Sequence, residues 1–131
     1  ETSLYVMIGV AGLQRSADHA DGTARVISAV APHFVRLRTF VPRVGTPLYQ
    51  TWKQGRLTLP DPYQALRETR RLVAAIDAPT HLVSDHLSNF LDVSGKLPEQ
   101  RNAMLARIDQ ALTWPRSRFR PDTDTLVHLG L

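Results

Sequence analysis

The chain has 131 residues, of which 43% are hydrophobic and 21% charged, and these proportions are typical of one modest globular domain. Its formal charge of +4 comes almost entirely from arginine, because only Lys53 and Lys96 are lysines. It contains no cysteine, which excludes disulfides, thiol nucleophiles and iron–sulfur clusters held by cysteines of this chain.

No apolar run reaches the length of about 18 residues that a membrane span needs, so no membrane partner is expected. The first eight residues lack the basic start and the cleavage site of a secretory signal, which favours a cytoplasmic location. The arginine-rich balance has two interpretations. It could reflect solvated helix faces or a surface for nucleic acid, although most of the arginines are spread along the chain.

The first elements are predicted to be a strand and a helix. Residues 4–10 form an apolar run typical of a strand covered on both faces in a parallel sheet. Gly9 and Gly12 bracket the end of this run and allow either a turn or a close approach of a ligand to the backbone. A helix is expected from Ser16, as a cap, to about residue 30. Its predicted apolar stripe comprises Ala20, Ala24, Ile27 and Ala31.

The second strand is predicted over residues 35–41, and its two faces differ. Val35, Leu37, Thr39 and Val41 alternate with Phe34, Arg36, Arg38 and Phe40. Pro42 ends this strand, and Thr46 followed by Pro47 predicts the capped start of a short helix to about residue 54.

A third strand–helix unit is predicted after a long helix. Asp61, Pro62 and Gln64 form a strong helix start. The predicted inner face of that helix comprises Leu66, Thr69, Val73 and Ile76, with Arg67, Arg70 and Arg71 in solvent. Residues 80–84 are predicted to form a strand, and Pro98 to open a last helix. Its inward residues would be Met104, Leu105, Ile108 and Leu112, and no element is predicted for the tail that follows.

This order predicts an α/β fold with three βα units of a parallel sheet. Three strands are few, because a closed barrel needs about eight such units and an isolated three-stranded sheet exposes its edges. Part of a larger barrel or open sheet is therefore favoured over a complete small domain.

Two groups of residues are candidates for chemistry. Arg36 and Arg38 could face the lumen of a barrel, where anions bind, or lie on an edge strand that reaches solvent or a structural aspartate. After the third strand, Asp85, His86 and Asn89 could form an acid–base or substrate site, or could simply satisfy loop hydrogen bonds. The spacing of His19, His33, His81 and His128 does not indicate a metal site.

The chain resembles the C-terminal half of radical S-adenosylmethionine proteins, in the iron–sulfur oxidoreductase group related to oxygen-independent coproporphyrinogen oxidase. The resemblance covers about residues 4–112. It lies in residues 6–12 (VMIGVAG), 34–39 (FVRLRT), Pro42, 45–49 (GTPLY), 82–89 (LVSDHLSN), 95–98 (GKLP), Met104, Leu105, Ile108 and Asp109.

This resemblance implies three units of a partial (β/α)6 TIM-like barrel over residues 1–112, with a tail over residues 113–131. It implies that Gly9, Gly12, Arg36 and Arg38 lie on the S-adenosylmethionine side, and it leaves Asp85, His86 and Asn89 as candidates for the substrate side. The family's CxxxCxxC loop, which holds the [4Fe-4S] cluster, is absent. The chain is therefore expected to be a fragment that is not catalytic alone and whose partner is the rest of its barrel.

Two other functions remain as hypotheses. A small basic α/β module could bind single-stranded nucleic acid through its arginines. An interaction domain could self-associate to cover its strand edges, and some self-association is also expected of a barrel fragment.

Overall fold

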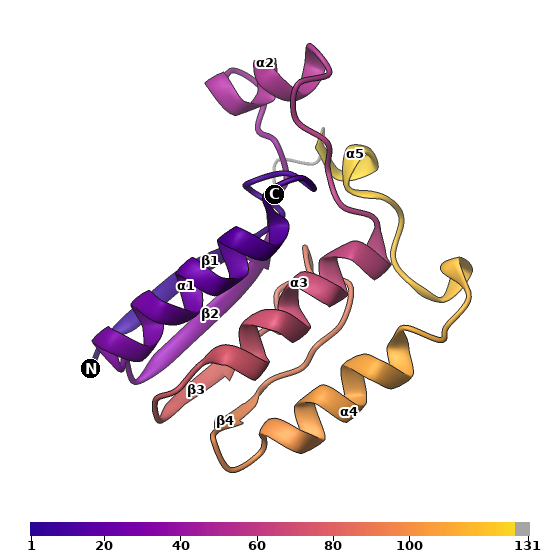
Figure 1. Cartoon of the computed structure of the whole chain (residues 1–131). Helices are drawn as coiled ribbons and strands as arrows, with labels where there is room; N and C mark the ends of the chain where they lie inside the picture. Colours follow the sequence, from indigo (N-terminus) through magenta and orange to yellow (C-terminus); the bar gives the residue numbers. More distant parts are fainter. Residues whose placement is uncertain (128–131) are drawn as a thin grey trace.

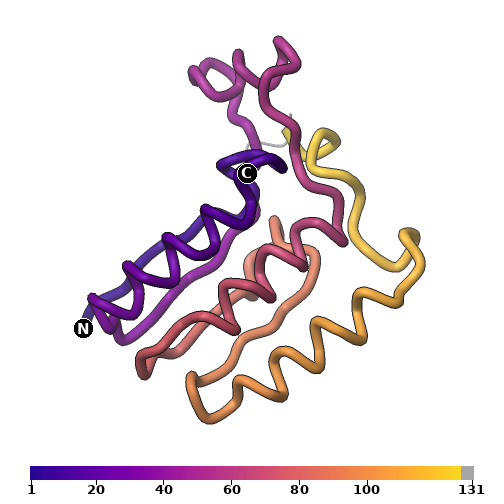
Figure 2. The backbone as a smooth tube through the Cα atoms, viewed as in Figure 1, coloured from indigo at the N-terminus to yellow at the C-terminus, as the bar shows by residue number. Residues whose placement is uncertain are grey.

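The computed structural model describes residues 1–127. The elements are β1 (Ser3–Ile8), α1 (Ser16–Val30), β2 (Phe34–Thr39), α2 (Pro47–Lys53), α3 (Pro62–Ala75), β3 (Thr80–Val83), β4 (Gly95–Leu97), α4 (Arg101–Ala111), the 3-10 turn η1 (Arg116–Arg118) and α5 (Thr123–Leu126). The long helices α1, α3 and α4 lie side by side on one face of the sheet, and α2 extends beyond the strand ends (Figure 1). The same layering is visible in the backbone trace (Figure 2).

The sheet has four strands in the order β1-β2-β3-β4. The first three are parallel, which confirms the predicted α/β class and its parallel strands, whereas β4 runs antiparallel to β3. The prediction of a wholly parallel sheet is therefore wrong. β4 has only three residues, and such a short edge strand leaves no alternation of apolar and polar residues to detect.

One face of the sheet packs against the helices. Val35, Leu37 and Thr39 of β2 are buried, as the alternation predicts, and β2 ends at Thr39 rather than at residue 41. Val6 and Ile8 of β1 are also buried. The apolar residues among them share one core cluster with residues of the three long helices, including Ile27, Leu72, Val73, Met104 and Ile108.

The other face of the sheet is uncovered within residues 1–127. Tyr5 and Met7, which alternate with the buried residues of β1, are 63% and 48% exposed. The prediction that β1 is covered on both faces is therefore wrong for the described part of the chain. The reason is that α1, α3 and α4 all lie on one side of the sheet.

The predicted helix starts are partly confirmed. Asp61 forms a full capping box with Gln64, and the Thr46 side chain accepts a hydrogen bond from the Tyr49 N–H. Ser16 is not a cap: it is the first residue of α1, and its hydroxyl donates instead to the carboxylate of Glu68. Pro98 does not open α4, because the chain completes β4 and a turn before the helix begins at Arg101.

The apolar faces of the helices are largely as predicted. Ala20, Ala24 and Ile27 are buried, but Ala31 is exposed because it ends α1 in a left-handed conformation with φ of 50°. In α3 the predicted residues Leu66, Thr69, Val73 and Ile76 are all buried. In α4, Met104 and Ile108 are buried, and Leu105 and Leu112 are half-buried.

Charged side chains join neighbouring helices at the surface. Arg71 of α3 makes a forked ion pair with Asp21 of α1, and Arg70 makes one with Asp109 of α4. Arg67 is exposed, as expected. The prediction that Arg70 and Arg71 are simply solvated is therefore incomplete, because these two side chains also make ion pairs between neighbouring helices at the outer surface.

The start of the C-terminal tail packs on the body of the molecule. Phe119 is buried among Tyr63, Phe90 and Trp114, and the Tyr63 hydroxyl donates to the Trp114 carbonyl at 2.7 Å. Residues 128–131, including His128, lie outside the described residues. Within residues 1–127 the longest and most apolar helices fall short of what a membrane span requires.

Candidate functional site

The uncovered face of the sheet carries aromatic and basic side chains in register. Parallel pairing places Tyr5 beside Arg36, and Met7 beside Arg38. On the other side of β2, Phe34 pairs with His81 and Arg36 with Val83, and His81 in turn pairs with Lys96 of β4. Because side chains alternate along a strand, all of these residues share the face that the helices leave open.

The two arginines of β2 rest on aromatic rings rather than on carboxylates. The Arg36 guanidinium lies 5.3 Å from the centre of the Phe34 ring, and that of Arg38 lies 5.3 Å from the centre of the Tyr5 ring. Within residues 1–127 neither forms an ion pair. β2 is paired on both sides, which excludes the edge-strand interpretation, so both cations point from the middle of an open face.

The side-chain amide of Asn89, one of the predicted site residues, makes three hydrogen bonds within the protein. Its amide nitrogen donates to the carbonyls of Leu37 and Ser84 at 2.9 and 3.0 Å. Its amide oxygen accepts from the Thr39 hydroxyl at 3.1 Å. Asn89 therefore connects the carboxyl ends of β2 and β3. It satisfies hydrogen bonds of the loop, which is the structural alternative given above, and its amide has little hydrogen-bonding capacity left for a ligand.

His86 belongs to a second tie between the same strand ends. The Thr39 N–H donates to the Ser88 hydroxyl at 3.1 Å, and this hydroxyl lies 2.8 Å from His86 Nδ1. The Ser88 N–H also donates to Nδ1, at 3.2 Å. A backbone N–H can only donate, so Nδ1 is an acceptor and the proton of the neutral ring is on Nε2.

The electrostatic surroundings favour the neutral form of His86. Its pKa is lowered from the usual 6.5, first because partial burial penalises the imidazolium and second because the charge of Arg38 lies nearby. Asp85 opposes this effect in part. Asp85 itself is exposed and makes no side-chain hydrogen bond within the described residues, so it does not share the hydrogen bond with His86 that an acid–base couple would need.

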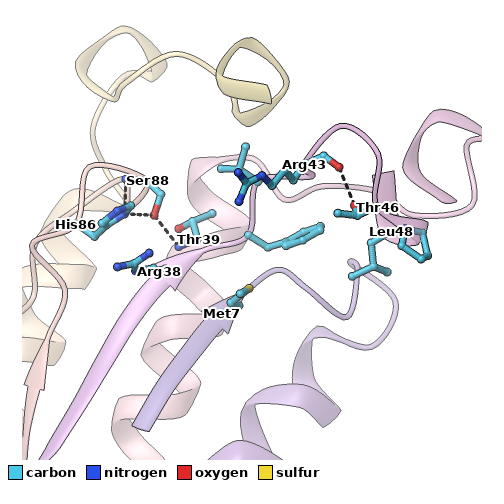
Figure 3. A pocket seen from close by; sticks show the side chains of 11 residues that line it. Met7, Arg38, Thr39, Arg43, Thr46, Leu48, His86 and Ser88 are labelled. Carbon is cyan, nitrogen blue, oxygen red and sulfur yellow. Dashed lines mark hydrogen bonds between the residues drawn. The ribbon is translucent and has the colours of Figure 1, made fainter. Parts of the chain in front are cut away.

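A cavity of about 400 Å³ lies at the carboxyl ends of β1 and β2 (Figure 3). It is lined by Met7, Arg38, Thr39, Phe40, Val41, Arg43, Thr46, Pro47, Leu48, His86 and Ser88. Arg38 projects from β2 close to His86, and Met7 rises from β1 below them. The structure therefore brings together two of the predicted site residues, Arg38 and His86.

Gly9 and Gly12 lie at the exit of β1 and do not line this cavity. Gly9 has a φ of 86°, its N–H donates to Glu68 at 2.8 Å, and a Cβ there would lie 2.7 Å from Pro60 Cγ. Gly12 closes the turn by donating its N–H to the Gly9 carbonyl at 3.1 Å. Backbone conformation and packing thus account for Gly9 without a ligand, and its predicted contact with a cofactor stays a prediction.

Glu68 is a buried anchor that the sequence does not reveal. Its side chain accepts from Gly9 N–H and Ser16 Oγ at 2.8 and 2.7 Å, and lies 3.4 Å from His19 Nδ1. A buried carboxylate needs such partners. In the sequence, Glu68 looks like an ordinary surface glutamate of the predicted helix. Its partners could not be recognised there, because they lie more than 45 positions earlier in the chain.

Arg120 supports the site from the tail. Its guanidinium stacks 3.7 Å from the centre of the Phe90 ring and donates twice to the Ser88 carbonyl, at 3.0 and 2.6 Å. Burial lowers the pKa of Arg120 to about 10, with Asp122 acting in the opposite direction. No local pattern in the tail distinguishes this arginine from Arg116 or Arg118.

Within residues 1–127 the structure shows no group of three or more histidine, aspartate or glutamate side chains that could hold a metal ion. A comparison with the models of known protein families and a search of curated proteins both find no match to this chain.

Proposed function

We propose that the chain is one wall of a radical S-adenosylmethionine barrel, the wall that faces the cofactor and the substrate. The observation that carries this proposal is the open face of a sheet whose first three strands are parallel, with two arginines that have no acidic partner in residues 1–127. In barrels of βα units, ligands bind at the carboxyl ends of the strands. Arg38, His86 and the cavity lie at those ends.

The residues of the chain fit S-adenosylmethionine in part. The guanidinium of Arg38 or Arg36 suits the methionyl carboxylate, since arginine binds carboxylates through two parallel hydrogen bonds. When bound, S-adenosylmethionine supplies the adenosyl group that radical enzymes use to abstract hydrogen. The role of the chain's own residues is to bind and orient it and to exclude water.

The chain does not fit the [4Fe-4S] cluster. It has no cysteine, and the described residues form no alternative ligand set. No reductive step is therefore assigned to this chain, and the cluster would be held by the remainder of the barrel. In this proposal the remainder is also the partner that covers Tyr5, Met7 and Phe34 on the open face.

Binding of S-adenosylmethionine to the isolated chain tests the proposal. We expect amide and methyl NMR signals near Met7, Arg38 and His86 to shift on titration, and Arg38→Ala to weaken binding. Arg67→Ala is the control, because Arg67 is an exposed arginine on the helix layer. Shifts confined to other surfaces, or equal binding by the two variants, would contradict the proposal that this chain forms part of the S-adenosylmethionine site.

A second candidate function, binding of single-stranded nucleic acid, is favoured by one observation. Aromatic and basic side chains lie side by side on the open face, as in sheets on which bases stack; they are Phe34, Tyr5, His81, Arg36, Arg38 and Lys96. Titration of the same chain with an oligothymidylate separates the two functions. Binding that weakens steeply with salt and is lost in Phe34→Ala favours nucleic acid.

A further inference from the structure

The cavity at the ends of β1 and β2 has two chemically distinct sides. Its apolar side is formed by Met7, Phe40, Val41, Pro47 and Leu48, and of these Met7 and Leu48 are 48% and 40% exposed. Its volume of about 400 Å³ is in the range of small-molecule sites. Apolar side chains that stay accessible beside a cavity of this size favour a ligand with an apolar part.

The polar side of the cavity is cationic. Arg38 and Arg43 both line it, both are exposed, and neither has an ion-pair partner in residues 1–127. No aspartate or glutamate contributes to the lining. Two guanidinium groups without acidic neighbours favour an anionic headgroup, since arginine matches carboxylate and phosphate geometry.

The hydroxyl protons of the lining are already donated within the protein, and that of Thr39 goes to the Asn89 amide oxygen. The Ser88 hydroxyl bonds to Thr39 N–H and to His86 Nδ1. The Thr46 hydroxyl donates to the Arg43 carbonyl at 2.7 Å (Figure 3). It also accepts a hydrogen bond from the Tyr49 N–H. Because Nδ1 of His86 is occupied, this ring can offer only its Nε2–H. The side-chain donors that remain available to a ligand are therefore the two guanidinium groups and this Nε2–H, which suits a headgroup that accepts hydrogen bonds.

We propose that this cavity binds an amphipathic acid. Its carboxylate or phosphate would lie against Arg38, Arg43 and His86, and its apolar chain or ring against Met7, Phe40 and Leu48. This assignment names a substrate class for the proposed barrel wall, and it rests on the proposed function only for the view that the cavity faces substrate.

Matched probes that differ in one end test the inference. Octanoate and octyl phosphate carry the two possible headgroups on the same chain, and octanol carries none. We expect an acid to bind the purified chain at least about tenfold more tightly than octanol, because one charge-assisted hydrogen bond contributes about 1.5–3 kcal/mol. Which of the two acids binds more tightly identifies the headgroup.

Variants assign the binding to this cavity. Arg43→Gln should weaken binding of the acid about tenfold and leave octanol binding unchanged, and Leu48→Ala should weaken both. Arg67→Gln is the matched control for charge, and circular dichroism shows whether each variant is folded. Equal binding of acid and alcohol, or equal binding by the Arg43 and Arg67 variants, would overturn the inference.

A titration with S-adenosylmethionine separates this inference from the proposed function. Arg43 is not among the residues proposed for the cofactor, so Arg43→Gln should leave S-adenosylmethionine binding intact. If the chain binds octanoate but not S-adenosylmethionine, the cavity assignment is supported and the proposed cofactor site is contradicted. Binding of S-adenosylmethionine without either acid would support the wall and overturn the cavity assignment.

Discussion

Single side chains of this protein connect segments that are far apart in the chain. Arg120 in the tail holds the Ser88 carbonyl, and the Ser88 hydroxyl in turn bonds to Thr39 N–H and to His86. The conformation of His86 at the cavity therefore depends on a residue 34 positions away. Arg120 is not among the residues that line the cavity, so we infer that it acts as a positioning residue.

Arg120→Ala should destabilise the fold by about 1–3 kcal/mol, because a buried carbonyl loses charge-assisted hydrogen bonds. It should also shift the NMR signals of the His86 ring. Denaturant unfolding and a histidine NMR spectrum measure the two effects. Arg118→Ala is the matched control. Arg118 is also an arginine of the tail, but it is exposed, and its guanidinium stacks on the Trp114 ring, 3.9 Å from the ring centre, rather than on Phe90. Similar results for the two variants would refute the positioning role.

His86 should make stability depend on pH in a defined direction. Its pKa in the folded state is lowered below 6.5, so the unfolded chain binds more protons than the folded chain in the window between the two values. Stability should therefore fall as pH drops from 6.5 towards the lowered pKa. Asp85 and Arg38 are the charged groups that act on this ring.

Unfolding midpoints measured across this pH window in the native chain and in His86→Gln check the prediction. The variant should show a shallower dependence on pH, because glutamine does not titrate. An unchanged slope would mean that His86 does not contribute to the acid sensitivity of the fold.

At the scale of elements, both backbone conformation and packing constrain the turn after β1. Gly9 and Gly55 both have positive φ, of 86° and 76°, but only Gly9 lies against another atom where a Cβ would be. Gly9→Ala should therefore cost about 1–3 kcal/mol more than Gly55→Ala, because overpacking adds to the same backbone strain. Denaturant unfolding of both variants measures the difference in unfolding free energy. Equal losses of stability would show that Pro60 can move away from the new Cβ and that the close contact adds no strain.

The elements that could be predicted from sequence are those with local signals. The capping box at Asp61, the cap at Thr46 and the alternation of Val35, Leu37 and Thr39 involve neighbours within a few residues. β4 could not be predicted, because its three residues become a strand only by pairing with β3.

The candidate site follows the same division. Arg36 and Arg38 could be placed on one face from the period of a strand, but the choice between an edge and an open face needed the order of the sheet. Arg43, Glu68 and Arg120 could not be found from sequence. Their roles depend on atoms brought together by the fold, such as the Ser88 carbonyl and the Gly9 N–H.

At the scale of the whole molecule, the sheet is covered on one face only within residues 1–127. Tyr5 and Met7 are exposed on β1, which is also an edge strand of the sheet. Exposed apolar side chains beside an unpaired edge favour association. In the proposed parent protein the rest of the barrel would occupy this face.

The isolated chain should therefore self-associate as its concentration rises, and Met7→Lys should weaken the association by placing a charge on that face. Sedimentation velocity across a concentration series measures both. Val30→Lys is the control, because Val30 is 50% exposed but lies at the end of α1. A chain that stays monomeric at high concentration, or equal effects of the two variants, would contradict the predicted role of the open face.

The intact mass of the polypeptide that the native gene produces tests the central claim most directly. If the chain is one wall of a radical S-adenosylmethionine barrel, the native polypeptide is much heavier than 14.7 kDa. Its sequence should also carry a CxxxCxxC loop before the residue numbered Glu1 here. A native polypeptide that begins at or just before Glu1, with no such loop, would contradict the account.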